Sequence, residues 1–222
     1  MRRLIRDQSI SIFFGVLFLG ALVGQAIFGH RAYNDDAVAH GSETISLGRY
    51  VVSSDYGQAV LENWQSEYLQ FLLLILATMW FFERGSTESE PKPGRTTDEE
   101  EKVGRYATER SPSWARAGGW RQTIYSYSLP ILMATVWLLS SFGQSVTGWS
   151  VYNEEQRAHD QPTVSWAAYL TRPDFWEETL QNWQSEFLAV GSMAVLSVYL
   201  RQRGSPESKP VGASHDSTGV EA

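Results

Sequence analysis

The chain has 222 residues, a formal net charge of −7 and no cysteine. Without cysteine the protein forms no disulfide, performs no thiol chemistry and holds no metal through thiolates. The acidic balance also disfavours nucleic acid as a partner, because phosphate binding requires clustered Lys and Arg. The overall composition resembles that of a soluble protein, but it averages four strongly apolar segments with acidic loops and a charged linker.

The chain contains an internal duplication. Residues 63–67 read Asn-Trp-Gln-Ser-Glu, and the same five residues return 119 positions later. At this offset residues 24–91 align with residues 143–210 without a gap, and 24 of the 68 pairs are identical. Between Gln70 and Phe82 the copies share apolar character and almost no identities, which is typical of a helix that faces lipid. A repeat at a fixed offset therefore organises the fold.

The first predicted membrane helix covers residues 10–28, a run of 19 residues without a charge. This length is enough to cross about 30 Å of hydrocarbon. The basic start of the chain also fits a signal peptide. The matching segment, residues 128–148, lies in mid-chain, however, so we interpret both segments as retained transmembrane helices.

The second helix of each hairpin is predicted at residues 64–82 and 183–201. The apolar parts of these segments are too short to cross a bilayer alone, so each helix must begin earlier. Thr171 and Asp174 resemble a capping box, with Pro173 tolerated in the first turn. Four aromatic residues at the outer ends are expected to act as anchors at the headgroup level. They are Trp64, Tyr68, Trp183 and Phe187.

Each hairpin encloses a long loop that carries Tyr33–Asp36 or Tyr152–Glu155. A short amphipathic piece in each loop, at residues 44–51 and 163–170, is predicted to form an interfacial helix. The repeated histidines His40 and His159 lack a second ligand at metal-binding spacing. We therefore expect them to be solvated.

Four parts of the chain follow from this pattern: repeat 1 at residues 9–91, a charged linker at 92–127, repeat 2 at 128–210 and a tail at 211–222. The linker and the tail are expected to be disordered at least in part. Lys and Arg gather at the two termini and in the linker, which places all three in the cytoplasm by the positive-inside rule. The predicted fold is an all-α inner-membrane protein with four crossings, built from two tandem hairpins of the same orientation.

Several strings in the second repeat resemble a family of bacterial integral-membrane proteins. These strings are Gly143-Gln144, Tyr152-Asn153, Asn182 to Leu188 and Leu200 to Lys209. The family is a domain of unknown function, and the resemblance covers nearly the whole chain outside the linker and the tail. It implies a membrane location and carries no activity, ligand or catalytic residue.

A polar cluster is the main candidate site. Gln25 lies deep in the first helix, and Asn63 and Glu67 enter the second helix from the outer side, so the three side chains are expected to meet at similar depth. The equivalent residues of repeat 2 are Gln144, Asn182 and Glu186. One interpretation is an ion or proton site, because ionisable groups at membrane depth are usually functional. The favoured interpretation is hydrogen bonding between helices, with both glutamates at the interface.

The sequence contains no catalytic motif, and we expect no metal, no cofactor and no catalytic residue. The leading hypothesis is a non-enzymatic membrane protein that acts through structure and interaction. Its expected partners are the lipid bilayer and either a second copy or another membrane protein. A small ion or proton conducting protein is the alternative, and a membrane enzyme is the third hypothesis.

Overall fold

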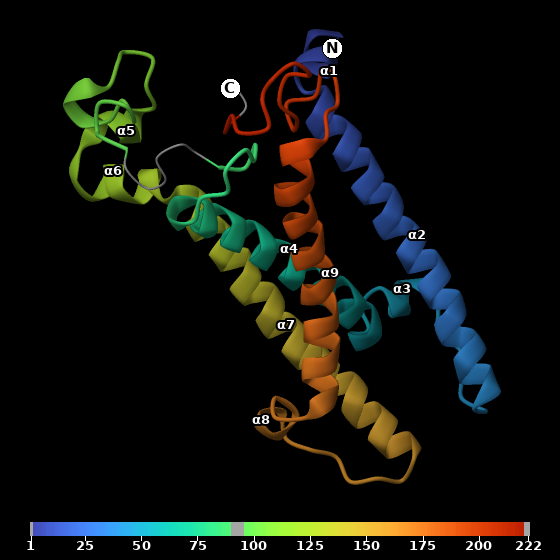
Figure 1. Ribbon diagram of the computed structural model, residues 1–222. Helices are drawn as coiled ribbons and strands as arrows, with labels where there is room; N and C mark the ends of the chain where they lie inside the picture. Colours follow the sequence, from blue (N-terminus) through green and yellow to red (C-terminus); the bar gives the residue numbers. More distant parts are fainter. Residues whose placement is uncertain (1, 90–95, 220–222) are drawn as a thin grey trace. The chain divides into compact units, whose positions relative to one another are not determined.

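The computed structural model describes residues 2–89 and 96–219, which form helices and loops without a β-strand (Figure 1). This confirms the predicted all-α class for the described residues. In chain order the elements are α1 (Arg2–Asp7), α2 (Ser9–Ala39), α3 (Leu47–Tyr50), α4 (Ser54–Trp80), η1 (Gly104–Tyr106), α5 (Ser113–Ala117), α6 (Gly119–Ser126), α7 (Ser128–Ala158), α8 (Trp166–Tyr169) and α9 (Pro173–Tyr199).

The chain divides into two compact units. The first contains the residues up to Leu61 together with Gly143–Tyr169, and the second contains Glu62–Phe142 and the residues from Leu170 onward. The first unit thus holds α2, α3 and α8, whereas the second holds η1, α5, α6 and α9. The helices α4 and α7 contribute to both units.

Helices of equal length recur along the chain. α2 and α7 each have 31 residues, α4 and α9 each have 27, and α3 and α8 each have 4. The later member of each pair begins 119 positions after the earlier one. The short helices α3 and α8 lie inside the two segments for which the sequence predicts interfacial helices.

α2 continues well beyond its predicted end. The predicted loop at Tyr33–Asp36 is wrong, because these residues form the last turns of the helix. No Gly or Pro stands between Gly29 and Gly41, so nothing interrupts the helix there. It stops where Gly41 takes a left-handed conformation (φ 69°). The next amide then donates back across the final turn in a Schellman motif.

α7 ends in the same way, and the predicted loop at Tyr152–Glu155 is likewise helical. The amide of Gln161 donates to the carbonyl of Gln156 at 2.7 Å, which closes the Schellman motif. Here the left-handed position is Asp160 (φ 52°) instead of glycine. A side chain in this conformation is strained, although Asp tolerates it better than most residues.

The predicted capping box of α9 is wrong. The helix begins with Pro173 in its first turn, and its N-cap is Arg172, whose side chain makes no capping hydrogen bond. The Asp174 carboxylate instead pairs with the Arg172 guanidinium at 3.7 Å. Thr171 therefore stands one position too early to cap the helix.

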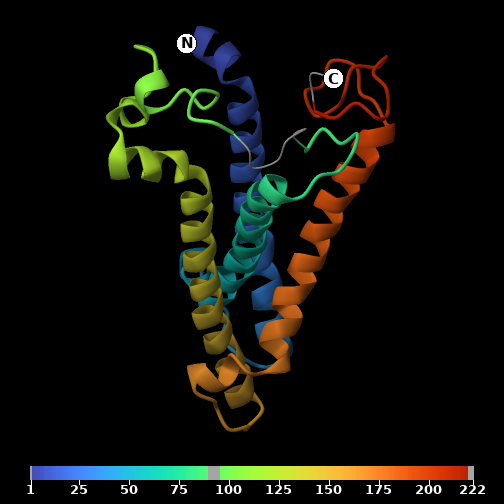
Figure 2. The same ribbon diagram turned by 60° about the vertical axis from the view of Figure 1, so that its left-hand side comes forward.

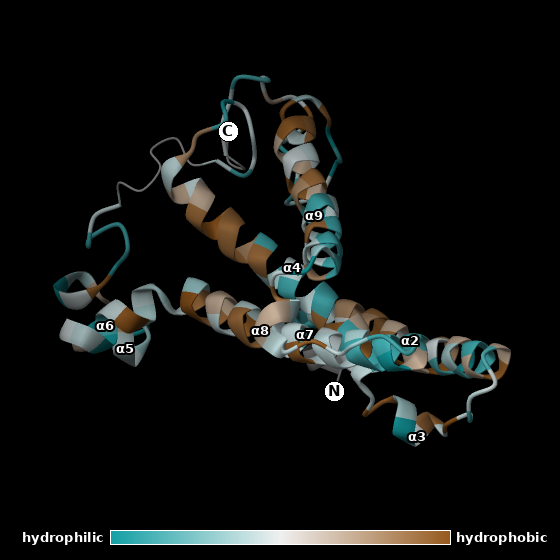
Figure 3. Cartoon of the chain, turned by 90° about the horizontal axis from the view of Figure 1, so that it is seen from below, coloured by the Kyte–Doolittle hydropathy of each residue, from teal (hydrophilic) through white to brown (hydrophobic). Residues whose placement is uncertain are grey.

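Apolar side chains point outward, whereas the buried side chains are largely polar. On α2 the side chains of Phe13, Phe14 and Leu17 are all more than half exposed. Figure 3 shows the same apolar character along α2. Eight polar residues are buried in the helices: Gln65, Ser66, Ser140, Gln144, Ser145, Asn153, Thr179 and Ser197. This distribution is the inverse of that in a water-soluble core.

Two helices, α2 and α7, are long and apolar enough to cross a membrane by length and composition. At 1.5 Å per residue each is about 46 Å long, which exceeds the hydrocarbon thickness. α4 and α9 do not pass the same test.

The regions expected to be disordered contain folded elements. η1, α5 and α6 lie in the predicted linker, and its residues 92–95 lie outside the described residues. Residues 211–219 of the predicted tail form turns next to the end of α9 (Figure 2), and residues 220–222 lie outside the described residues. The division into repeats, linker and tail stays a prediction.

The end of α7 leads to the first prediction. Replacing Asp160 with glycine removes a side chain from a left-handed position and should stabilise the protein by about 0.5–1 kcal/mol. This corresponds to a rise of roughly 1–4 °C in the midpoint of thermal unfolding. The matched control is Gly41→Ala at the end of α2, which should lower the midpoint. Equal midpoints for Asp160→Gly and the parent would show that Asp160 is not strained.

Candidate functional site

Two asparagines fasten the outer loops to the long helices. The Asn34 side chain on α2 accepts from the Ile45 amide at 2.8 Å and donates to the Ile45 carbonyl at 3.0 Å. Asn153 on α7 makes the same two bonds with Val164, also at 2.8 and 3.0 Å. One amide side chain thus satisfies both backbone groups of a residue eleven positions along the chain. We call this arrangement the asparagine clamp.

A second donor strengthens each clamp. The His30 ring nitrogen Nε2 lies 2.7 Å from the Ile45 carbonyl, and the Trp149 indole N–H donates to the Val164 carbonyl at 2.7 Å. Neither residue could be found from repeat identities, because position 30 is His and the equivalent position 149 is Trp. What the two side chains share is a nitrogen-containing ring one turn before the repeated asparagine.

A tyrosine fills the space beneath each clamp. Tyr50 of α3 packs against Gly29, and Tyr169 of α8 packs against Gly148, so that a Cβ at either glycine would overlap the phenol oxygen. Both tyrosines are buried, with 6% and 2% of their surface exposed. Glycine is therefore required at these two positions because a tyrosine approaches the helix closely, not because the helix needs to be flexible.

The Tyr50 environment is apolar on one side and acidic on the other. Burial raises the pKa of the Tyr50 phenol above its ordinary value, and the nearby Asp55 carboxylate and Tyr56 raise it further. The pKa of Tyr33 is raised for the same leading reason and by Asp55 and Glu154. Both phenols therefore stay neutral over the physiological range.

The predicted polar cluster is distributed over both units. Gln25 and Gln144 belong to the first unit, where Gln25 donates to the Ala59 carbonyl at 3.4 Å and Gln144 is 2% exposed. The other four members belong to the second unit: Asn63, Glu67, Asn182 and Glu186. The expectation that Gln25 meets Asn63 and Glu67 at one depth stays a prediction.

In the second unit, the two copies of the repeated Asn-Trp-Gln-Ser-Glu motif interact. The Trp183 indole N–H on α9 donates to the Gln65 side-chain oxygen on α4 at 2.8 Å. Gln65 is 1% exposed, and its side-chain nitrogen has no hydrogen-bond partner among the described residues. Glu67 and Glu186 stand at equivalent positions of the motif on the same two helices.

The aromatic anchors take different positions. Trp64 and Phe187 are exposed, with 37% and 43% of their surfaces accessible. Trp183 is half-buried, and its ring lies 6.3 Å from that of Phe187. Its N–H is used by Gln65. The predicted anchoring of these residues and of Tyr68 at the membrane surface stays a prediction.

At the other ends of α4 and α9, a repeated Arg-Gly-Ser string folds into matching turns. Ser89 accepts from the Glu83 amide at 3.0 Å, and Ser208 accepts from the Gln202 amide at 2.8 Å. The amide of Gly85 in the first turn donates to the Thr218 hydroxyl, so the end of the chain covers that turn. We call the two turns the inner loops, after the orientation that the sequence predicts.

Each inner loop carries a glutamate, Glu88 or Glu207. Burial raises the pKa of Glu88 above its ordinary value, and repulsion from Glu207 raises it further. These two glutamates occupy equivalent positions, 119 residues apart. Each has its backbone amide held by a serine hydroxyl two residues before it, Ser86 or Ser205.

Lys209 organises the end of the chain. Its ammonium group donates to the carbonyls of Ser214, His215 and Ser217 at 3.2, 3.0 and 3.0 Å. Only 1% of the residue is exposed. Burial lowers its pKa, and the nearby Arg201 guanidinium lowers it further. The sequence analysis missed this role because all three acceptors are backbone groups.

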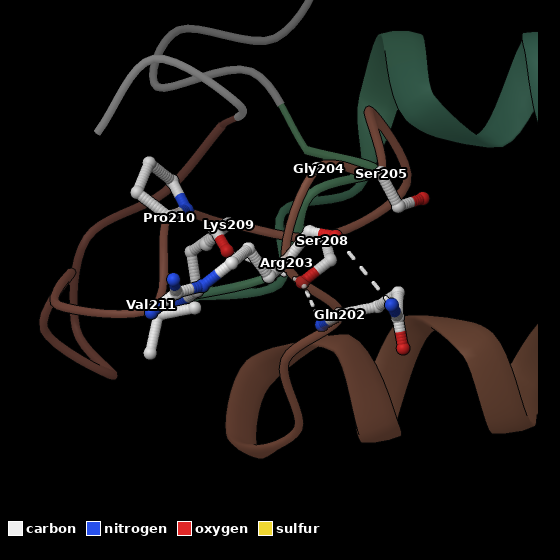
Figure 4. A pocket seen from close by; sticks show the side chains of 8 residues that line it. All are labelled: Gln202, Arg203, Gly204, Ser205, Ser208, Lys209, Pro210 and Val211. Atoms are coloured by element: carbon white, nitrogen blue, oxygen red, sulfur yellow. Dashed lines mark hydrogen bonds between the residues drawn. The ribbon is translucent and has the colours of Figure 1, made fainter.

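A cavity of about 410 Å³ lies beside the second inner loop (Figure 4). It is lined by residues 202–205 and 208–211. The polar groups that line it are engaged in the loop itself, including the Ser208 hydroxyl and the Lys209 ammonium. Among the described residues, no three His, Asp or Glu side chains are placed to hold a metal ion.

The asparagine clamp yields the second prediction. Asn153→Ala leaves the Val164 amide without its side-chain acceptor and the Val164 carbonyl with only the Trp149 N–H, and should destabilise the protein by about 1–3 kcal/mol. Asn34→Ala should have a similar effect. Asn153→Asp keeps the acceptor but loses the donor, so its loss should be intermediate at pH 7. Thermal unfolding of the purified variants measures these differences. A neutral effect of Asn153→Ala would mean that water replaces the clamp.

Comparison with known proteins identifies a family but no activity. The family described as a domain of unknown function (DUF6766) matches residues 1–220. Searches of the curated proteins and of the solved structures find no significant match. Because the match extends over nearly the whole chain, this protein belongs to the DUF6766 family.

Proposed function

We propose that the protein is a four-crossing α-helical protein of the inner membrane, built from two tandem hairpins with both termini in the cytoplasm. It acts without catalysis, through contacts that its outer loops and outer helix ends make with a second copy or with another membrane protein.

The distribution of polar and apolar side chains supports the membrane location. α2 and α7 are long and apolar enough to cross, and α2 presents large apolar side chains outward along the predicted crossing. α4 and α9 carry acids in their first halves and are apolar in their second halves. With 27 residues each, about 40 Å, they are long enough to cross with their first turns outside the hydrocarbon, while Glu67 and Glu186 lie within its outer part.

The matched hydrogen bonds support the tandem hairpins. The asparagine clamp, the tyrosine against glycine and the serine-held inner loop each occur twice at an offset of 119 residues. A duplicated gene that keeps the same orientation in the membrane gives two copies related by an axis along the membrane normal.

One observation carries the functional proposal. Both halves keep the polar contacts that shape the outer loops, while apolar residues on and beside the first outer loop remain exposed. Leu47 and Val52 of the loop have 42% and 80% of their surfaces accessible, and Val38 in the last turn of α2 has 65%. A fixed loop that presents apolar side chains fits a protein interaction surface better than a solvated linker.

Single cysteines test this proposal directly, because the natural chain has none. Val52→Cys in the outer loop should react with a membrane-impermeant maleimide in intact cells, whereas Glu109→Cys in the linker should react only after permeabilisation. A photoreactive maleimide at position 52 should then give one discrete adduct, either a dimer of the chain or a complex with one membrane protein. The matched control at position 109 should not give this adduct.

Two outcomes would contradict the proposal. Reaction of Glu109→Cys in intact cells would reverse the orientation. A lack of any protein adduct at position 52, despite labelling of its thiol, would remove the interaction surface.

The Glu67 and Glu186 pair favours a second candidate, a small ion or proton conducting protein. These glutamates occupy the same position of the repeated motif on α4 and α9, and two carboxylates that come close attract a cation or share a proton. The unpaired side-chain nitrogen of the buried Gln65 adds a polar group nearby. Such groups at membrane depth are costly unless they serve a function.

A double substitution distinguishes the two candidates. If the pair binds a cation or a proton, thermal unfolding of the parent should shift with pH or with one cation, and Glu67→Gln with Glu186→Gln should abolish that shift. A ligand present at 100 times its Kd stabilises by about 2.7 kcal/mol. Glu177→Gln, on an exposed part of α9, is the matched control and should behave like the parent. Identical responses of parent and double variant would remove the second candidate.

A further inference from the structure

The short helices α5 and α6 form a compact hairpin before α7. They contact each other and are separated by Gly118; this residue and Gly119, the first of α6, both take left-handed conformations (φ 69° and 61°). Figures 1 and 2 both show the two helices side by side at the amino end of α7. All of these residues belong to the second unit.

One face of α6 is apolar and uncovered by the described residues. Trp120 and Ile124 stand four positions apart, and Tyr127 follows on the same face. Their surfaces are 64%, 44% and 52% exposed. On the opposite face Gln122 is half-buried and lies beside Gly104 of η1. The hairpin is therefore folded with its polar side inward.

Trp114 of α5 extends this apolar face. Its ring meets the Trp120 ring edge to face, with 6.0 Å between the centroids, and 42% of its surface is exposed. We call Trp114, Trp120, Ile124 and Tyr127 the hairpin face. An exposed cluster with two tryptophans is typical of a surface that enters the boundary between headgroups and hydrocarbon.

Positive charge surrounds the hairpin face. Residues 104–127 contain four arginines and a single acid, Glu109. The Arg121 guanidinium lies 5.5 Å above the Trp120 ring. Among the described residues, neither Arg121 nor Arg116 forms a salt bridge. These charges complement an anionic surface.

The hairpin has little freedom to leave the membrane. α6 ends at Ser126 and α7 begins at Ser128, and the backbone bonds of Tyr127 continue into α7. If α7 crosses the bilayer as proposed, the hairpin face is held within the headgroup layer. If the hairpin face stayed in water, Trp114 and Trp120 would be exposed to solvent beside a membrane surface where tryptophan is favoured.

We propose that the α5–α6 hairpin binds the anionic headgroup layer of the cytoplasmic leaflet. Trp120 and Ile124 enter the boundary with the hydrocarbon, and Arg116 and Arg121 bind lipid phosphates. The inference rests on the proposed crossing by α7. It adds a lipid-binding surface to a segment for which the sequence predicts only a charged linker.

The experiment uses nitroxide labels on single cysteines in the full-length protein, reconstituted into vesicles of zwitterionic phosphatidylcholine with or without 30% phosphatidylglycerol. Relative accessibility to oxygen and to a water-soluble nickel complex measures the depth of each label. A label at Ile124→Cys should be immersed, whereas the matched label at Ser126→Cys, on another face of α6, should be shallower. Immersion at position 124 should increase with phosphatidylglycerol.

Charge substitutions test the headgroup contact. Replacing Arg116 and Arg121 with glutamine should lower the ratio of immersed to exposed label about fivefold for each arginine, and only in vesicles that contain phosphatidylglycerol. A label at Leu138→Cys, an exposed position on α7, reports the crossing independently. If Leu138 is not immersed, the proposed crossing fails.

Three results would overturn the inference while leaving the crossing intact. In each, Leu138 is immersed. In the first, position 124 is as accessible to the nickel complex as position 126 in both lipids. In the second, position 124 is closed to both reagents, which indicates a protein partner on the hairpin face. In the third, immersion does not depend on phosphatidylglycerol or on the arginines.

Discussion

The asparagine clamp is the interaction on which the outer part of this protein depends. Each clamp closes a loop against a long helix by pairing both backbone groups of Ile45 or Val164 with one side chain. Ordering a loop costs conformational entropy, and a backbone near lipid needs partners for its polar groups. The clamp meets both requirements with one residue. It also positions the short helix that follows, so that Tyr50 or Tyr169 reaches its glycine.

The helices also associate through a small number of polar contacts. In lipid, apolar side chains gain little by packing on one another, so association depends on close packing and hydrogen bonds between helices. Gln65 and Trp183 provide such a bond between α4 and α9, and small polar residues such as Ser66 and Ser140 are buried. Apolar side chains on α2 are exposed, as the proposed crossing by this helix requires. The inverse arrangement of polar and apolar groups is therefore one physical solution, not a defect of packing.

The sequence predicted the helical class because that class depends on local patterns such as charge-free apolar runs. The helix ends were predicted poorly for a specific reason. Tyr33-Asn34-Asp35-Asp36 has the composition of a turn, and local propensity assigns it to a loop. In the structure the Asn34 side chain faces a partner eleven residues away, and this contact stabilises the helix it belongs to. His30, Trp149 and Lys209 escaped detection because their partners are carbonyls, which leave no trace in the sequence.

The bonds made by the repeated polar side chains favour a role in protein interaction over a role in catalysis. Asn34, Asn153, Ser89 and Ser208 all bond to the backbone of their own chain, so their polar atoms shape loops and are not directed at a substrate. Catalytic groups must instead be held within reach of a reacting atom. Two repeated acids, Glu67 and Glu186, stand at the same place of the motif on α4 and α9, and the proposed conducting function depends on them. The proposed recognition of a partner depends instead on the loops that the asparagine clamps shape.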